Sequence, residues 1–321
     1  AVEKDGPIRR FTLDGEPLET VAPGPGGVMT ITQVPGRKDQ FLATRKFFSP
    51  NFGGDDAAIA SYTKQADGSW SEQILCDLPY VHRFGILKAA DGQLWVLACS
   101  IKGGAETGVK DDWRTPGAVW AAPLSDNLEQ YTADNQLKLT CIANYQVQNH
   151  GFWTAPDKSY VLISTAAGVF RYVPPTTPQG AWDVTCLLVQ PTSDIVATDF
   201  DGDGKLEILT FSKFHGDTLA IWHEGQTRDR FEQVWCDPQK RSFLHALWAA
   251  DLNGEKCAVI GNRKDGRDLL LVRYVDGEYT VDVIDHDLGP ANCMVYRHNG
   301  SDYIAAAYRE TDQLALYKVV E

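Results

Sequence analysis

An acidic loop at residues 199–207 carries the clearest metal-binding pattern in the chain. It reads Asp-Phe-Asp-Gly-Asp-Gly-Lys-Leu-Glu, so carboxylates occupy positions 1, 3, 5 and 9, with Gly204 at position 6. Alternate residues of a tight turn can aim their oxygens at one point, and a hard cation needs several oxygens at about 2.4 Å. The loop therefore predicts a structural calcium site whose ligands are Asp199, Asp201, Asp203, Glu207 and the carbonyl oxygen of Lys205.

Three histidines form a second group of candidate residues. His82 in PYVHRFG, His150 in QNHGFW and His245 in FLHALW each stand just before or at the start of an apolar, strand-like segment. Neutral imidazole binds zinc, manganese or iron and leaves positions for a substrate. Imidazole also titrates near neutral pH, which suits a general acid or base. The sequence leaves both chemistries open: a divalent metal such as zinc held by the three rings, or proton transfer by them.

Basic and aromatic residues accompany these histidines. Fixed cations indicate an anionic or carbonyl-bearing ligand whose developing charge they stabilise. The candidate substrate-binding residues are Arg45, Arg83, Lys102, Trp113, Lys213, Arg263 and Arg309. Two further candidates for proton transfer are His215 and Tyr308. Aromatic residues available to pack on a sugar face include Phe47, Phe48, Phe52 and Tyr80.

Six repeated units must position these residues. The segment LEILTF at 206 has counterparts QFLATR at 40, WVLACS at 95, YVLIST at 160, CAVIGN at 257 and YIAAAY at 303. Each is preceded and followed by another strand-like segment, and five units have a fourth. Four-stranded units at intervals of about 45 to 65 residues indicate an all-β fold, a β-propeller. Six blades is the favoured count, and a seventh in the long second interval is the alternative.

The repeat also predicts how the chain is organised as a whole. We expect a single propeller domain over residues 1–321. The last unit has three strands, so a strand from the N-terminal segment 8–21 is expected to close the ring on it. In a propeller blade, the loops before the first strand and after the second open on one face. The histidines and cations are therefore expected around one mouth, and the acidic loop on the opposite face.

Net charge and cysteine content indicate which kinds of partner and which cellular compartment to expect. The net charge is −13, which argues against nucleic acid or an anionic membrane surface as a partner. Seven cysteines cannot all pair within the chain, which favours a reducing, cytoplasmic location and leaves a secreted or periplasmic one open. Four of them recur on fourth strands, where we interpret them as small buried hydrophobes and not as metal ligands: Cys76, Cys141, Cys186 and Cys236.

The strand–loop–strand context of the acidic loop resembles the calcium hairpins of FG-GAP and VCBS propeller repeats. Position 12, where an EF-hand has a bidentate glutamate, is Thr210. The segment HALWAADLNG at 245, with its sibling at 199, resembles repeats of aldos-2-ulose (anhydrofructose) dehydratase relatives over about three of the six units. That resemblance implies channel-facing histidines, bound metals and dehydration of keto-sugars.

These observations together predict a carbohydrate-active enzyme. The expected reaction is metal-assisted proton abstraction and β-elimination on a keto-sugar or uronide, which makes the protein a carbon–oxygen lyase. The expected ligand is a sugar or sugar acid, free or within an oligosaccharide. The alternative is a propeller that binds carbohydrate or protein without catalysis. The sequence shows no Gly-rich phosphate loop, no G-x-S-x-G elbow, no HExxH and no CxxC pair.

Overall fold

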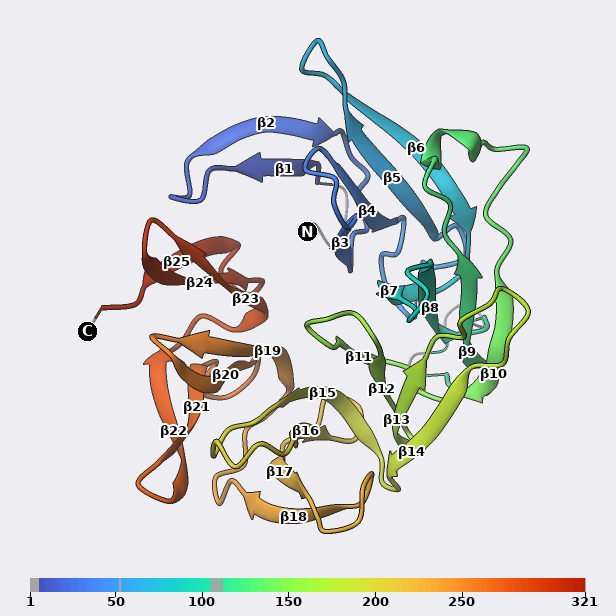
Figure 1. Cartoon of the computed structure of the whole chain (residues 1–321). Coiled ribbons are helices and arrows are strands. Elements are labelled where there is room, and N and C mark those ends of the chain that lie inside the picture. The colour runs from blue at the N-terminus through green and yellow to red at the C-terminus, as the bar shows by residue number, and fades with distance from the viewer. Residues whose placement is uncertain (1–5, 52, 105–108, 110–111, 321) are drawn as a thin grey trace. The chain divides into compact units, whose positions relative to one another are not determined.

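The computed structural model describes residues 6–51, 53–104, 109 and 112–320, so the candidate aromatic Phe52 lies outside the described residues. The described chain consists of strands and turns, with one short 3-10 helix, η1 (Leu128–Gln130). After a two-stranded N-terminal sheet, six antiparallel sheets succeed one another along the described chain, and strands that pair within a sheet are neighbours in the sequence. The protein is therefore an all-β propeller with six blades, as the repeats predict (Figure 1).

The chain divides into two compact units. The first, residues 1–167 with 171–184, contains blades 1 and 2 and most of blade 3. Its strands are β3 (Ile31–Gln33), β4 (Gln40–Arg45), β5 (Ala58–Lys64) and β6 (Trp70–Asp77) in blade 1; β7 (Val81–Lys88), β8 (Leu94–Lys102), β9 (Pro116–Pro123) and β10 (Thr140–Gln146) in blade 2; and β11 (Gly151–Thr154), β12 (Val161–Thr165), β13 (Gly168–Val173) and β14 (Asp183–Leu188) in blade 3.

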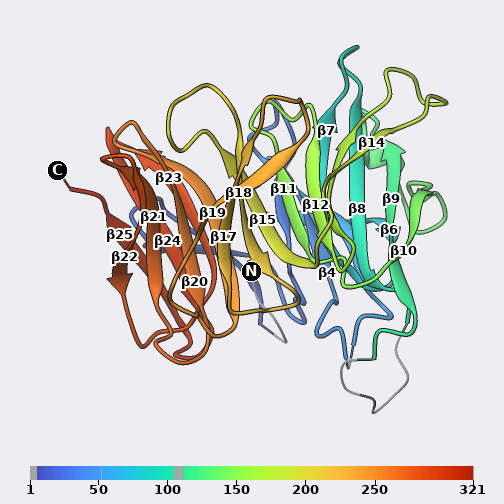
Figure 2. The same ribbon diagram turned by 90° about the horizontal axis from the view of Figure 1, so that it is seen from below.

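The second unit, residues 168–170 and 185–321, contains blades 4 to 6. Sheets β19–β22 and β23–β25 lie side by side in it (Figure 2). The single-domain organisation stays a prediction. The strands are β15 (Thr192–Thr198), β16 (Glu207–Ser212), β17 (Leu219–Glu224) and β18 (Phe231–Cys236) in blade 4; β19 (Leu244–Leu252), β20 (Glu255–Asn262), β21 (Leu269–Val275) and β22 (Glu278–Asp285) in blade 5; and β23 (Pro290–His298), β24 (Ser301–Tyr308) and β25 (Gln313–Lys318) in blade 6.

The core lies on the second strands of the blades. Every residue of β12 is buried, and so are the consecutive residues 257–262 of β20. Both faces of such a strand are covered, which explains why these segments read as continuous apolar runs and not as alternating ones. This burial is what makes the repeat visible in the sequence. The part of the chain that the structure describes contains no helix of the length and hydropathy that a membrane crossing needs.

The fourth strands differ from the sequence interpretation. The fourth strand of blade 2 begins at Thr140, and bulges interrupt its pairing with β9. The prediction of buried cysteines is confirmed for Cys76 only. A fourth strand lies at the outer edge of its blade, where alternate side chains face the solvent. The exposed cysteines are Cys141, Cys186 and Cys236, and all seven are free thiols.

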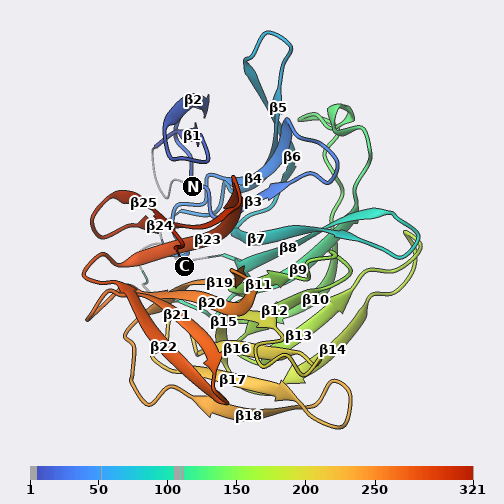
Figure 3. The same ribbon diagram turned by 60° about the vertical axis from the view of Figure 1, so that its left-hand side comes forward.

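The N-terminal segment also differs from its predicted pairing. Strands β1 (Ile8–Phe11) and β2 (Pro17–Ala22) pair with each other as a hairpin, and the described sheet of blade 6 has three strands (Figure 3). The expected N-terminal strand is therefore not part of that sheet as described. The hairpin instead packs on blade 1, because its apolar residues join a buried cluster formed by Ile8, Val21, Ala22, Val28, Ala43, Ala60 and Tyr62.

Glu19 links this hairpin to blade 1 through hydrogen bonds, and its carboxylate makes this contact sensitive to pH. Its Oε1 accepts hydrogen bonds from Trp70 Nε1 (3.1 Å), Arg10 Nη1 (2.8 Å) and Lys64 Nζ (3.3 Å). These bonds, that from Trp70 first, lower the pKa of Glu19 to about 2. Because the pKa in the unfolded chain is about 4.3, the ionised carboxylate stabilises the fold above that value. This stabilisation is lost as the pH falls through the folded-state pKa.

We therefore expect the wild-type protein to lose more thermal stability than the variant Glu19→Gln when the pH falls from about 5 to about 2.5. The amide cannot ionise, so its contacts do not change over this range. Thermal unfolding of both proteins, followed by circular dichroism at a series of pH values, measures the difference. Parallel curves would contradict this role of Glu19.

Candidate functional site

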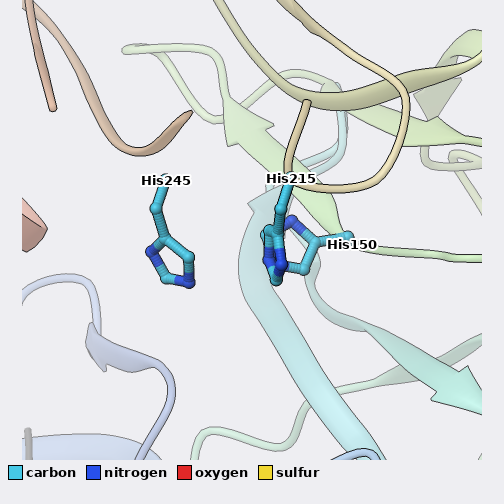
Figure 4. A group of neighbouring side chains, drawn as sticks. All are labelled: His150, His215 and His245. Carbon is cyan, nitrogen blue, oxygen red and sulfur yellow. The ribbon is translucent and has the colours of Figure 1, made fainter. Parts of the chain in front are cut away.

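Two histidines of the second unit lie together at the ends of blades 4 and 5. His245 is the second residue of β19, and His215 lies in the loop after β16. Their ring centroids are 4.9 Å apart, with 37° between the ring planes. Both rings project in the same direction from their backbones in Figure 4, which also draws His150 of the first unit. In this pair, His245 is predicted as a metal ligand and His215 as a proton-transfer residue.

The backbone around this pair is held in an unfavourable conformation. His215 has φ 48° and Phe243 has φ 62°, both in the left-handed region, which bulky side chains rarely adopt. Leu244 N donates to Gly216 O at 3.0 Å, and His215 N donates to Ser193 Oγ at 3.0 Å. Such strain costs on the order of 1 kcal/mol or more per residue and persists where surrounding contacts enforce it, often at functional sites.

A hydrogen bond sets the tautomer of His245. Its Nδ1 lies 2.7 Å from the carbonyl oxygen of Ala291. A carbonyl oxygen only accepts, so Nδ1 carries the proton in the neutral imidazole and Nε2 carries the lone pair. A histidine oriented in this way by a backbone carbonyl is arranged as a general base or as a metal ligand through Nε2.

Positive charge lies against the same cluster. The ring of Phe243 is 4.5 Å from that of His215, and the Arg263 guanidinium and Lys264 ammonium lie 5.0 and 5.1 Å from the Phe243 ring centre. Arg263 also forms an ion pair with Glu310 at 2.7 Å, and Arg309 lies 3.7 Å from the same carboxylate. The Phe243 ring therefore lies against both the imidazole of His215 and two cations, and one of these cations, Arg263, is paired with a carboxylate.

Tyr308 has surroundings that oppose its predicted role as a base. Its hydroxyl lies 2.6 Å from that of Tyr317, which in turn donates to Asp285 Oδ2 at 2.6 Å. Since Tyr317 uses its proton on Asp285, Tyr308 donates to Tyr317. Burial is the first cause that raises the pKa of Tyr308, and the bond to Tyr317 adds to it. The catalytic role of Tyr308 stays a prediction.

The first unit holds a second pair of histidines. His82 lies on β7 and His150 directly before β11, and both side chains are buried. Their ring centroids are 4.7 Å apart, and the ring of Phe47 meets His82 edge-on at 5.1 Å. Asn149, which precedes His150, donates to Ala118 O at 3.1 Å. Two of the three histidines predicted as metal ligands therefore lie side by side in this unit, and their role stays a prediction.

The predicted substrate-binding cations have different environments. Arg45 forms an ion pair with Glu72 on β6, and Arg83 Nη1 donates to Met29 O at 2.9 Å. Lys102 is fully buried, with its ammonium 4.8 Å from the ring centre of Trp113, whereas Lys213 is exposed. Arg263 is the predicted cation that the described contacts place in the His215–His245 cluster. Roles in substrate binding stay predictions for all of them.

The acidic loop joins β15 to β16, as predicted. The two carboxylate oxygens of Asp199 accept N–H bonds from Gly202 and Gly204, at 2.8 and 3.0 Å. Lys205 N donates to Asp203 Oδ1 at 2.8 Å. The carboxylates that gather are those of Asp201, Asp203 and Glu207, and they gather with the imidazole of His223.

His223 was missed in the sequence, although a signal for it exists. Strand β17 pairs with β16 in a register that sets His223 directly opposite Glu207. Directly opposed residues of an antiparallel pair project to the same face, so this register predicts the contact. Burial, followed by the charges of Asp201 and Asp199, raises the pKa of Glu207 to about 8. The loop thus holds like charges close together around one imidazole.

Comparisons with known proteins support the fold. No family model matches the chain, and no curated protein matches it either. A periplasmic gluconolactonase from Pseudomonas aeruginosa is similar in structure, with a TM-score of 0.62 and 14% identity over 99% of this chain and 89% of that one. A putative 6-phosphogluconolactonase from Bacteroides uniformis has a TM-score of 0.61 and 16% identity over 98% and 87%. A sialidase from Streptococcus pneumoniae has a TM-score of 0.53 and 9% identity over 94% of this chain and 69% of that one. At these identities, the likeness shows that this chain shares their fold.

Proposed function

We propose that this protein is a carbohydrate-active propeller that carries out proton abstraction and β-elimination on a keto-sugar or uronide. The observation that carries the proposal is the His215–His245 pair. Its rings are 4.9 Å apart, the tautomer of one is set by Ala291, and Arg263 and Lys264 lie against the adjoining Phe243 ring. Two adjacent titratable groups beside fixed cations are what an acid–base reaction through an anionic intermediate requires.

In the proposed reaction, each imidazole carries out one of the two proton transfers. Nε2 of His245 takes the proton from the carbon next to the substrate carbonyl, and the resulting enolate oxygen is stabilised by the nearby cations. The enolate then collapses into a carbon–carbon double bond as the C–O bond at the β-carbon breaks. His215, protonated, gives its proton to the leaving oxygen. The products are an unsaturated or dehydrated sugar and water or a shortened saccharide.

Lactone hydrolysis is the second candidate. It is favoured by the similar solved structures, which include a gluconolactonase and two putative 6-phosphogluconolactonases. In this reaction His245 would take a proton from water, whose oxygen attacks the lactone carbonyl as the ring C–O bond breaks. His215 would protonate the released oxygen. Both candidates use the same imidazoles and the same class of sugar-derived ligand.

One panel of substrates separates the candidates. Anhydrofructose, other keto-sugars, uronides and gluconolactone are each incubated with the protein, while ultraviolet absorbance and acid release are recorded together. Elimination is expected to create an absorbing double bond, and hydrolysis to release acid without new absorbance. Saturable sugar binding without turnover would favour the non-catalytic alternative. A protein that neither binds nor converts any member of the panel would contradict the proposed function.

The predicted ions do not enter these steps. A zinc or other divalent ion held by His82, His150 and His245 stays a prediction, and so does calcium in the acidic loop. The imidazoles fit the first ion by their chemistry, because neutral imidazole is a common zinc ligand. Metal analysis of the purified protein, repeated on the double variant His82→Ala/His150→Ala, tests it. The cytoplasmic location likewise stays a prediction.

A further inference from the structure

The four gathered side chains of the acidic loop and β17 are spaced like the ligands of one ion. One ligand atom each from Asp201, Asp203, Glu207 and His223 lies within 4.8 Å of the other three. Nε2 of His223 is 3.2 Å from Asp203 Oδ2, 3.4 Å from Glu207 Oε1 and 3.8 Å from Asp201 Oδ2. Atoms bound at ~2.1 Å to one tetrahedral ion are about 3.4 Å apart. A small divalent cation would need only slight movements of these groups.

Glu207 gives an independent reason to expect an ion. Its side chain is fully buried, and Oε2 accepts a hydrogen bond from Phe200 N at 2.5 Å. The other oxygen, Oε1, is also buried and has no hydrogen-bond donor among the residues that the structure describes. It points at Nε2 of His223. A buried carboxylate oxygen that lacks a donor is costly, and coordination to a cation removes that cost.

The chemistry of the ligands selects the class of ion. Calcium takes six to eight oxygens, whereas imidazole suits zinc and its first-row neighbours. Asp199, the first ligand that the loop pattern predicts, is engaged by the amides of Gly202 and Gly204 and shapes the turn. We propose that this site binds a transition-metal dication of the zinc class, in place of the predicted calcium, through Asp201, Asp203, Glu207 and His223.

The site is open to ions from solution. A cleft of about 500 Å³ is lined by Asp201 and His223 together with the aromatic residues Trp235, Tyr274 and Tyr279. His223 is 18% exposed and Asp203 is 40% exposed, so the ion can enter and leave without unfolding of the blade. The loop and the His215–His245 pair share no residue. The proposal therefore stands whether or not the proposed reaction is correct.

Zinc titration of protein labelled with nitrogen-15 in histidine tests the proposal. The chain has seven histidines, and single substitutions assign their resonances. We expect the resonance that disappears in His223→Gln to shift at the first equivalent of Zn²⁺, and calcium at the same concentration to leave it unchanged. Zn²⁺ should also raise the melting temperature of the metal-free wild-type protein. His223→Gln should weaken zinc binding at this site at least tenfold, and His286→Gln, at an exposed histidine, should not.

Several outcomes would overturn the proposal. A calcium-induced rise in the melting temperature that equals that with zinc and survives His223→Gln would restore the calcium site. A His223 resonance unchanged by zinc, cobalt and manganese would show that the four groups form only an ion-pair cluster. If His223→Gln does not fold, the titration of the wild-type protein still decides, with Glu207→Gln as the second variant. Turnover on the sugar panel should persist in His223→Gln, which separates this proposal from the proposed function.

Discussion

Replacing His245 with Asn will reduce turnover on the converted sugar by a factor of about 10² to 10⁴, which is the usual contribution of a positioned general base. Nε2 of His245 is assigned as the base because Nδ1 donates to Ala291 O at 2.7 Å. Asparagine keeps a polar group near that carbonyl and removes the imidazole. The melting temperature should change by only a few degrees, because the side chain is half-buried and not part of a core cluster. Initial rates and thermal unfolding of the same preparations measure both effects.

The variant His215→Asn provides the partner measurement. Asn tolerates the left-handed backbone better than most residues do, so this change at φ 48° removes the imidazole without adding strain. We expect a loss of kcat comparable to that of His245→Asn. The double variant should be little worse than either single one, since residues that act as a unit are not additive. The matched control is His286→Asn, at a histidine whose side chain is 72% exposed. Full activity of both single variants would show that the pair is not the proton-transfer site.

The fold was largely predictable because most of the second strands are buried on both faces. The run CAVIGN at 257 is buried throughout, and similar apolar segments recur at the other five positions, so one apolar pattern located every blade. The outer strands were less predictable, because one open face relaxes the pattern. Cys141 illustrates this limit: it matches its counterparts in the sequence and yet lies exposed on a strand whose pairing is interrupted by bulges.

The candidate site was predictable only in part. Residue type and position in the repeat identified His245, because a histidine at the start of a first strand stands out against the apolar pattern. The partners depend on loop conformations that no period encodes. Phe243 and His215 adopt left-handed backbones, and Glu310 reaches Arg263 from another blade. His223 was predictable in principle but was missed. Its position opposite Glu207 follows from the pairing of β16 and β17, provided that the register is counted residue by residue.

Deleting residues 1–22 will destabilise the protein, because the N-terminal hairpin completes the core of blade 1. Ile8, Val21 and Ala22 are each less than 10% exposed, in a cluster that also holds Ala43, Ala60 and Tyr62. Burial of the two large aliphatic side chains contributes roughly 3–6 kcal/mol. Phe41, Trp70 and Ile74, which pack against the cluster, would become more exposed. We expect the melting temperature to fall by about 10 °C, measured by calorimetry.

Point variants separate this packing from a general effect of shortening the chain. Ile8→Ala removes a 6% exposed side chain from the cluster and should destabilise by about 2–4 kcal/mol. Leu18→Ala removes a similar volume from the same hairpin, but Leu18 is 48% exposed, so its loss should have an effect within about 0.5 kcal/mol. If the two variants have the same melting temperature, or if the truncated protein has that of the full-length one, the hairpin contributes nothing to the core. If Ile8→Ala alone is destabilised, the apolar face of the hairpin is part of blade 1, although its strands pair with each other and not with that sheet.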